Sequence, residues 1–230
     1  MAVLVLTLPL HPQPLNARFA ETRYLPLPGL LSRNGLKALR EETGLLETAA
    51  TRRGFRMKCM DDSPRHMTTL GGHRVARESA LISTLYRDAR LLELLTSLTG
   101  TDVLPVQDEV ERHVLNILHQ PGDTHGAHTD DYPLAPGPGP GPFPRSAAPA
   151  RWRRLLEYHP GRRDLTALEE SGTQQVHHQA GDAYLLPSDL TAHRVTPLCC
   201  PGTGRTVLNF AYTTRGHQTP TTGSARRLYG

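Results

Sequence analysis

The run Pro136-Gly-Pro-Gly-Pro-Gly-Pro-Phe-Pro144 restricts the fold more than any other feature of the sequence. Each proline lacks a backbone N–H donor, so alternate prolines cannot lie in the middle of a β-sheet. Strand-like sequence nevertheless resumes after the run, in Leu155-Leu-Glu-Tyr-His-Pro160. We therefore interpret residues 136–154 as an anomalous Pro/Gly/Arg segment, a flexible or polyproline-like insertion at the surface.

A second interpretation places the anomaly in the gene. If the codons are CCT and GGT, a shift of one base turns the repeated Pro-Gly into repeated Leu-Val, which would form a buried strand. On this hypothesis residues 136–154 are a frame-shifted strand, and the frame is restored near Leu155. Resequencing the DNA tests it, and an unambiguous reading without nearby compensating insertions or deletions would contradict it.

Length and composition limit the class of protein. A chain of 230 residues with 37% hydrophobic residues can bury one sizeable core, so we predict a single domain over residues 1–230. The net charge of +4 is scattered along the chain, with Lys37 and Lys58 as the only lysines. Phosphate binding requires clustered positive charge, so we expect no nucleic-acid partner.

The N-terminal residues and the cysteines bear on the cellular compartment of the protein. The first ten residues are apolar but too short to span a bilayer, and we expect residues 1–20 to be a poorly ordered leader or an edge strand. Cys59, Cys199 and Cys200 form neither a C-x-x-C pair nor an even disulfide framework. We therefore expect a reducing, cytoplasmic location and no membrane partner. The oligomeric state is left open.

Hydrophobic periodicity divides the chain into a helical and a β part. Residues 20–100 are predicted to be mostly helical support, with one helix near residues 30–44 and a second from Ser79 to Leu98. Between them, the polar turn of residues 60–66 is predicted to be a loop. From Val103 to about residue 215, short runs rich in β-branched residues alternate with Gly and Pro, which indicates a β core. Helices thus precede strands.

A small set of residues suggests metal chemistry. His128-Thr-Asp130 places two metal-ligand types at i and i+2, which share a face of an extended segment. This pair alone is common, and a solvated polar loop explains it equally well. His193 follows the apolar run Gly181-Asp-Ala-Tyr-Leu-Leu-Pro187, and Arg205 lies 12 residues beyond it. The combination is much more specific than any one part.

Two histidines and one carboxylate are the ligands of the facial triad that binds non-haem Fe(II) and leaves coordination positions open. The guanidinium of Arg205 offers a bidentate fork for a carboxylate. A zinc hydrolase could use the same His and Asp ligands, but hydrolysis needs no such carboxylate anchor.

These motifs resemble those of Fe(II)/2-oxoglutarate-dependent oxygenases. The resemblance implies a mainly β fold with flanking helices around a double-stranded β-helix, a jelly-roll or cupin-like core. It also implies that His128, Asp130 and His193 bind Fe(II) and form the catalytic centre, and that Arg205, with Asn116, binds 2-oxoglutarate. The implied reaction converts 2-oxoglutarate and O2 to succinate and CO2 and hydroxylates an unactivated C–H bond.

Residues 56–215 show a closer likeness. The runs Pro121-Gly-Asp-Thr-His125-Gly, Asp131-Tyr132 and His193-Arg-Val-Thr-Pro-Leu198 are similar to those of small oxygenases related to radical halogenases of free amino acids. In those halogenases a small residue replaces the carboxylate ligand and chloride takes its place. Because Asp130 is present here, the resemblance favours hydroxylation over halogenation.

The same likeness suggests contacts for a small-molecule substrate, a free amino acid or similar compound. It implies that Arg65 binds the substrate carboxylate. Further contacts are predicted at Glu111, His125, Asp131 and Asn209. Glu111 and Asn209 could equally be outward-facing strand residues, and Asp131 can reach the substrate only if the strand bends after Asp130. If the Pro/Gly segment removes a core strand, a catalytically impaired relative that acts only as a binding module is the alternative.

Overall fold

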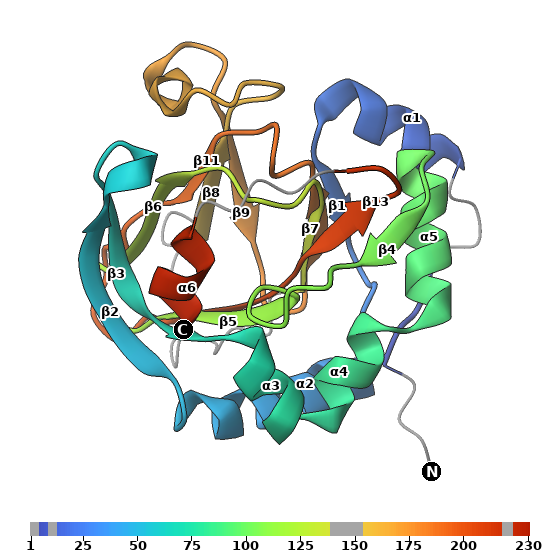
Figure 1. Cartoon of the computed structure of the whole chain (residues 1–230), viewed down its shortest axis with the longest axis horizontal. Coiled ribbons are helices and arrows are strands. Elements are labelled where there is room, and N and C mark those ends of the chain that lie inside the picture. The colour runs from blue at the N-terminus through green and yellow to red at the C-terminus, as the bar shows by residue number, and fades with distance from the viewer. Residues whose placement is uncertain (1–4, 9–12, 139–153, 218–222) are drawn as a thin grey trace.

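The computed structural model describes residues 5–8, 13–138, 154–217 and 223–230. Antiparallel strands curl around a common interior, and most of the helices lie to one side (Figure 1). This is the mainly β, jelly-roll-like architecture that the sequence resemblance predicts, so the predicted fold class is confirmed.

The helices of the described residues are short, and their bounds follow. They are α1 (Gln13–Thr22), α2 (Arg33–Glu47), α3 (Gly72–Glu78), α4 (Ala80–Tyr86), α5 (Ala89–Thr99) and α6 (Ser224–Tyr229). The strands are β1 (Leu25–Leu27), β2 (Thr51–Met57), β3 (Ser63–Leu70), β4 (Val103–Pro105), β5 (His113–Leu118), β6 (Thr124–His128), β7 (Ala135–Pro138), β8 (Arg154–Tyr158), β9 (Gln174–His178), β10 (Ala183–Leu186), β11 (His193–Val195), β12 (Arg205–Phe210) and β13 (Tyr212–Thr214).

The largest sheet has the strand order β12-β5-β3-β6-β11-β8-β9, and β2 pairs with β3 beside this path. A second sheet has the order β1-β10-β7, and β13 pairs with β4. Strands that are distant in sequence therefore become neighbours, notably β3 with β6 and β6 with β11.

Successive side chains of β5 and β12 point alternately toward the hydrophobic core and toward a cavity on the other face of the sheet. Leu115 and Ile117 of β5 and Leu208 of β12 belong to the main hydrophobic cluster, together with buried leucines of α2, α4 and α5. The residues between them, including Asn116 and Arg205, line a cavity on the other face. The period of two that defines a strand thus assigns one face of these strands to stability and the other to a site.

Capping residues define the ends of the supporting helices. The Ser32 side chain accepts from the N–H of Gly35 at the start of α2, and Ser79 and Asp88 cap α4 and α5 in the same way. Gly100 ends α5 in a left-handed conformation with φ 72°. The single helix predicted from Ser79 to Leu98 is therefore two helices, because the Asp88 cap starts a new one.

The structure corrects two of the sequence predictions. Residues 13–22 form α1, so the predicted poorly ordered leader is wrong for this part; Asn16 donates to the carbonyl oxygens at the end of α5. The second part of the predicted loop, residues 63–66, belongs to β3, which pairs with β2, β5 and β6. Its buried side chains include Thr68 and Thr69 as well as apolar residues, so no simple hydrophobic alternation marked it as a strand.

The beginning of the Pro/Gly run lies at a sheet edge. Ala135–Pro138 form β7, the outer strand of the β1-β10-β7 sheet. An edge strand tolerates proline because its outward side needs no donor. The rest of the anomalous segment, residues 139–153, lies outside the described residues, so both the insertion and the frame-shift interpretation stay predictions.

Candidate active site

The two histidines of the predicted triad are cross-strand neighbours. His128 ends β6 and His193 begins β11, and the two residues are register partners in this antiparallel pair. Their ring centroids lie 4.1 Å apart. The pairing of β6 with β11 thus brings together two residues that are 65 positions apart in the sequence. No local sequence pattern specifies this pairing.

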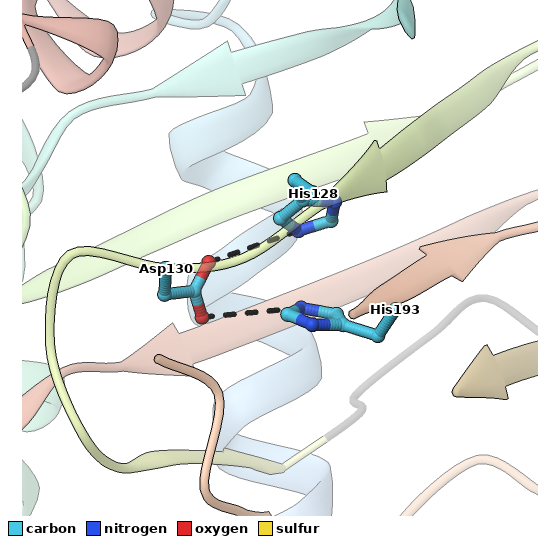
Figure 2. Close-up of side chains that lie close together, drawn as sticks. All are labelled: His128, Asp130 and His193. Atoms are coloured by element: carbon cyan, nitrogen blue, oxygen red, sulfur yellow. Dashed lines mark ion pairs between the residues drawn. The ribbon is translucent and has the colours of Figure 1, made fainter. Parts of the chain in front are cut away.

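Asp130 lies two residues beyond the end of β6 and turns back toward both rings (Figure 2). Its Oδ1 is 3.7 Å from Nε2 of His128 and its Oδ2 is 3.9 Å from Nε2 of His193. One ligand atom from each residue lies within 4.8 Å of the others. Two imidazole nitrogens and one carboxylate oxygen thus lie close enough together to bind a divalent metal ion.

Hydrogen bonds hold both imidazoles in the orientation that a metal requires. Nδ1–H of His128 donates to the carbonyl oxygen of Gly126 (2.7 Å), and Nδ1–H of His193 donates to that of Thr191 (2.8 Å). Since a carbonyl only accepts, the proton is on Nδ1 and the lone pair on Nε2 faces Asp130. Burial, with the nearby His125, lowers the pKa of His128 well below its usual value, which keeps the ring neutral.

Backbone contacts fix the segment that carries Asp130. Its N–H donates to the carbonyl oxygen of Ser188 (3.0 Å), and the Ser188 hydroxyl donates to the carbonyl oxygen of Tyr132 (3.1 Å). The loop between β10 and β11 therefore supports Asp130 as well as His193. This arrangement preorganises the three side chains.

Three adjoining cavities of about 400, 340 and 350 Å³, counted with the solvent-open space at their mouths, meet at the triad. We name the first the Arg205 cavity and the second the Arg65 cavity, after the arginine that lines each. The third lies beside Asn209 and Tyr132. His128 borders both named cavities.

The Arg205 cavity contains a buried cation that lacks a counter-ion. Arg205 is 3% exposed, and its Nη1 has no hydrogen-bond partner among the described residues. Burial lowers the pKa of this guanidinium from its usual value. Asn116 lines the same cavity and its Oδ1 is also unpartnered within the described chain. Buried groups of this kind require partners, so a bound carboxylate would fit beside Arg205.

The Arg65 cavity contains a second buried arginine, on β3. Arg65 is 1% exposed and donates to the carbonyl oxygens of Pro64 (3.1 Å) and Ala127 (3.4 Å), while its Nε is unpartnered within the described chain. Its register partner is His125, whose ring stacks on His128 at 3.9 Å between centroids. Burial lowers the pKa of Arg65 to about 10, so it stays a cation at neutral pH.

Two carboxyl groups besides that of Asp130 line the Arg65 cavity. Asp131 reaches it because β6 ends at His128 and the chain bends, as its predicted role requires. Glu111 lies in the turn before β5 rather than in a strand as predicted. Burial, with the charges of Asp131 and Asp130, raises the pKa of Glu111 to about 8. Desolvated like charges are costly, so this corner of the cavity favours a cationic group.

A model of the family described as Halogenase D matches residues 10–136 and 150–227. The chain belongs to the Halogenase D family. The part of the chain that the family model leaves unmatched includes most of the Pro/Gly run. No curated protein sequence matches the chain.

Solved structures share the fold of this Halogenase D family member at low sequence identity. An oxidoreductase of the 2OG-Fe(II) oxygenase family from Burkholderia pseudomallei is 14% identical with a TM-score of 0.60, and the match covers 95% of this chain and 99% of that one. HygX from Streptomyces hygroscopicus, solved with nickel and 2-oxoglutarate bound, is 13% identical with a TM-score of 0.61 and coverages of 88% and 87%. SnoN, a non-haem alpha-ketoglutarate-dependent epimerase from nogalamycin biosynthesis, is 18% identical, with a TM-score of 0.61 and coverages of 88% and 82%.

These findings confirm the predicted resemblance to Fe(II)/2-oxoglutarate-dependent oxygenases and to the halogenase group. The structure also brings every predicted site residue of this Halogenase D family member to the three cavities. They are His128, Asp130, His193, Arg205, Asn116, Arg65, Glu111, His125, Asp131 and Asn209. Their chemical roles stay predictions.

Sequence reasoning missed two tyrosines of the site. Tyr229 of α6 lines the Arg65 cavity, and its hydroxyl accepts from Nδ2 of Asn116 (3.3 Å). Tyr184 of β10 lines the Arg205 cavity. The six residues of α6 are too few for a reliable amphipathic pattern, whereas the buried-strand pattern around Tyr184 was visible but did not reveal which face met a cavity.

The remaining histidines do not join the triad. His113 is buried against Tyr86 and Phe210, and His178 forms a hydrogen bond with Tyr24. His177 is exposed.

None of the described helices is long and apolar enough to cross a membrane. A cytoplasmic location stays a prediction.

Proposed function

We propose that this chain is an Fe(II)/2-oxoglutarate-dependent oxygenase that hydroxylates an unactivated C–H bond of a free amino acid or an amino-acid-like molecule. The observation that carries the proposal is the placement of Asp130 between His128 and His193, together with a buried arginine in each of the two cavities that His128 borders. Two structural neighbours add support: HygX was solved with nickel and 2-oxoglutarate bound, and SnoN is an alpha-ketoglutarate-dependent epimerase.

When bound, Fe(II) would activate O2 at the expense of 2-oxoglutarate, which becomes succinate and CO2. His128, Asp130 and His193 would hold the ion through two imidazole nitrogens and a carboxylate. Arg205 pairs with the distal carboxylate of 2-oxoglutarate, and Asn116 contributes a hydrogen bond beside it. Because Arg205 is buried, little water would reach this ion pair, which strengthens it.

The Arg65 cavity orients the substrate. Arg65 and His125 hold the substrate carboxylate, while Glu111, Asp131 and Asn209 accept hydrogen bonds from its ammonium group. Complementary charges at both ends of a zwitterion fix its direction, so that one C–H bond faces the metal. Such positioning determines which carbon is oxidised.

Halogenation is a second candidate because the matching family model is that of Halogenase D. Chloride needs the coordination position that a carboxylate ligand would otherwise take. Asp130 directs one oxygen toward each histidine ring, so it competes for that position. This residue is our reason for preferring hydroxylation.

Spectroscopy and product analysis test the proposal. Anaerobic addition of Fe(II) and 2-oxoglutarate should produce a weak visible metal-to-ligand charge-transfer band, and its absence from folded protein would leave only the binding-module alternative. A panel of free amino acids is then incubated under air and the products are analysed by mass spectrometry. We expect succinate and a product heavier by one oxygen atom, whereas a chlorinated product in chloride buffer would establish halogenation.

A further inference from the structure

We infer that Cys199 and Cys200 form an oxidative modification site that reacts with hydroperoxides and closes to a vicinal disulfide, which loosens the turn before β6. The two residues lie in the connection between β11 and β12, outside the three cavities described above. The inference goes beyond the proposed function and does not depend on it, because its tests measure the chemistry of the thiols rather than turnover.

The two sulfur atoms already lie close together. In an extended chain consecutive side chains point to opposite sides, so adjacent cysteines have no need to contact each other. Here the Sγ atoms of Cys199 and Cys200 are 3.5 Å apart. Both residues are thiols in the structure, and Cys199 is exposed. Because the S–S bond of a disulfide is about 2.0 Å long, ring closure requires only a small further approach.

A β-turn holds Cys200 in place. Its carbonyl oxygen accepts from the N–H (3.4 Å) and from the hydroxyl (2.6 Å) of Thr203. The two central residues of the turn are Pro201 and Gly202, and Gly202 has a φ of 74°. Proline followed by a left-handed glycine is the sequence of a type II turn. Pro201 also restricts Cys200 to extended backbone conformations, which limits where its sulfur can lie.

Leu198 anchors the other side of the pair. Its N–H donates to the carbonyl oxygen of Asp123 (2.9 Å), and its own carbonyl oxygen accepts from the N–H of Gly122 (2.8 Å). The Leu198 side chain packs against a hydrophobic cluster that includes Met67 and Leu118, and these two residues line the Arg205 cavity. Since both flanks of the cysteine pair are fixed, strain in the pair acts directly on the turn before β6.

The reaction balances with a hydroperoxide as the oxidant. The Cys199 thiolate attacks one oxygen of hydrogen peroxide, the O–O bond breaks, and Cys199 becomes a sulfenic acid while the other oxygen leaves as water. The Cys200 sulfur then attacks the sulfenic sulfur, and the S–S bond forms with release of a second water. In total the two thiols lose two electrons and two protons. Cys199 reacts first because it is the more exposed of the two.

Ring strain makes this disulfide easy to reduce. A trans peptide bond fixes adjacent Cα atoms about 3.8 Å apart, whereas disulfides usually join Cα atoms about 4.4 to 6.8 Å apart. A strained disulfide has a high reduction potential and is labile rather than structural. The pair is therefore a dithiol under reducing conditions, closes when a hydroperoxide is present, and reopens with a thiol reductant.

Peptide mass spectrometry tests the modification. The reduced protein is treated briefly with excess hydrogen peroxide, alkylated with N-ethylmaleimide and digested with trypsin, which separates residues 195–205 from residues 59–65. The first peptide contains both cysteines of the pair and no methionine, and the second contains Cys59. We expect peptide 195–205 to lose two hydrogen atoms and take up no alkyl group, and dithiothreitol should reverse the change.

Three results of this measurement would contradict the inference. They are two alkyl groups on peptide 195–205, added oxygen atoms on its cysteines, and a disulfide from this peptide to Cys59 or to a second chain in place of the Cys199–Cys200 bond.

Two glycine variants test whether the turn preorganises the pair. Gly29, with a φ of 72°, lies in an equivalent Pro-Gly turn, in which the N–H of Leu30 donates to the carbonyl oxygen of Leu27 (3.3 Å). Within the described chain, a Cβ added at Gly29 or at Gly202 meets no atom within 4 Å. Gly202→Ala should slow disulfide formation by about 3- to 10-fold, because a Cβ disfavours the left-handed conformation that positions Cys200.

Gly29→Ala is the matched control, since it adds the same backbone strain to a turn that contains no cysteine. It should form the disulfide at the wild-type rate. Wild-type rates in Gly202→Ala, or equal slowing in both variants, would show that the turn does not preorganise the pair and would contradict this part of the inference.

Hydrogen exchange measures the effect of closure on the fold. We expect the amides of Leu198 and Gly122 to exchange about 3- to 10-fold faster in the oxidised protein, because their mutual contact is strained, and dithiothreitol should restore the original rates. The double variant Cys199→Ser/Cys200→Ser cannot close the ring and should not respond to hydrogen peroxide. Unchanged exchange in wild-type protein whose peptide 195–205 carries the disulfide would contradict the loosening of this turn.

Discussion

The Arg205 and Arg65 cavities each contain a buried arginine, but the charged side chains around the two arginines differ. Each contains an almost fully buried arginine with one nitrogen that lacks a partner in the described chain. Arg205 shares its cavity with neutral groups such as Tyr184 and Asn116, whereas Arg65 faces Glu111 and Asp131 as well. A lone cation suits an anion, and a cation opposite two carboxyl groups suits a zwitterion. This difference is our reason for proposing a diacid ligand in the Arg205 cavity and an amino acid in the Arg65 cavity.

The two cavities also differ in the elements that supply their side chains. The Arg205 cavity is lined mainly by strand residues. Glu111 and Asp131 of the Arg65 cavity come from a turn and from the segment after β6. Loops tolerate substitution better than paired strands. We therefore expect relatives of this fold to differ more in their substrates than in their co-substrate.

The largest expected effect is at Asp130, the carboxylate of the triad, which borders the Arg65 cavity. Asp130→Ala should lower hydroxylation by about 10³-fold or more, because it removes one of three ligands, equivalent to about 4 kcal/mol of transition-state stabilisation. Succinate release and product mass are the measurements. In chloride buffer the variant could gain a chlorinated product. Asp102→Ala, an exposed aspartate that pairs with Arg215, is the control, and wild-type activity in Asp130→Ala would contradict the metal site.

Removal of the cation from the Arg205 cavity should weaken the co-substrate alone. For Arg205→Met we expect the KM for 2-oxoglutarate to rise by about 10²- to 10³-fold, because the ligand carboxylate would be buried without a partner. Methionine fills most of the volume without a charge. Steady-state kinetics at saturating substrate measures the effect. An equal loss of affinity for the amino acid would show that the two cavities do not act separately.

The matching change in the Arg65 cavity should affect the substrate alone. We expect Arg65→Met to raise the KM for the amino acid by about 10- to 100-fold. This is less than the effect at Arg205, because His125 also borders the cavity and can still contact the carboxylate. The KM for 2-oxoglutarate should stay the same. Melting temperatures of both arginine variants identify any loss that arises from unfolding.

A smaller effect is expected from Glu111→Gln. It should raise the substrate KM by about 10-fold or less, since Asp131 remains. The free protein should become more stable by about 1 kcal/mol. The folded-state pKa of Glu111 is raised to about 8, so in the wild type its ionisation increasingly opposes folding as pH rises above the unfolded pKa near 4.5. Urea unfolding should show no difference below pH 4 and the full difference above pH 8.

The smallest effect on catalysis is expected at Asp123, in the turn that leads into β6. Its carboxylate accepts from Arg52 and from the N–H of His119 (2.8 Å). Burial would raise the pKa of Asp123, but these hydrogen bonds outweigh it and the pKa is lowered. Asp123→Asn should reduce stability by about 2 kcal/mol at neutral pH and leave both KM values unchanged. The difference should vanish as pH falls through the lowered pKa of the folded protein, as chemical denaturation can measure.

Much of the site was predictable because its residues belong to recognisable local patterns. His128-Thr-Asp130, His193 after a buried strand and Arg205 on the next strand are each visible without any tertiary information. The chain from Val103 onward was correctly predicted as β-rich, since short β-branched runs alternate with Gly and Pro. The strand β3 was missed because several of its polar side chains are buried and its neighbours in the sheet come from other parts of the chain.

The sequence by itself determined the types of the candidate metal ligands, because metal preference depends on the chemistry of individual side chains. Only the tertiary structure decided that His128 faces His193, that Arg65 lies beside His125, and which other side chains enter the two cavities. Strand register between distant segments depends on the burial of whole faces rather than on any local motif. The separation of the two buried arginines into two cavities therefore depends on the tertiary structure, because strands and turns from distant parts of the sequence line each cavity.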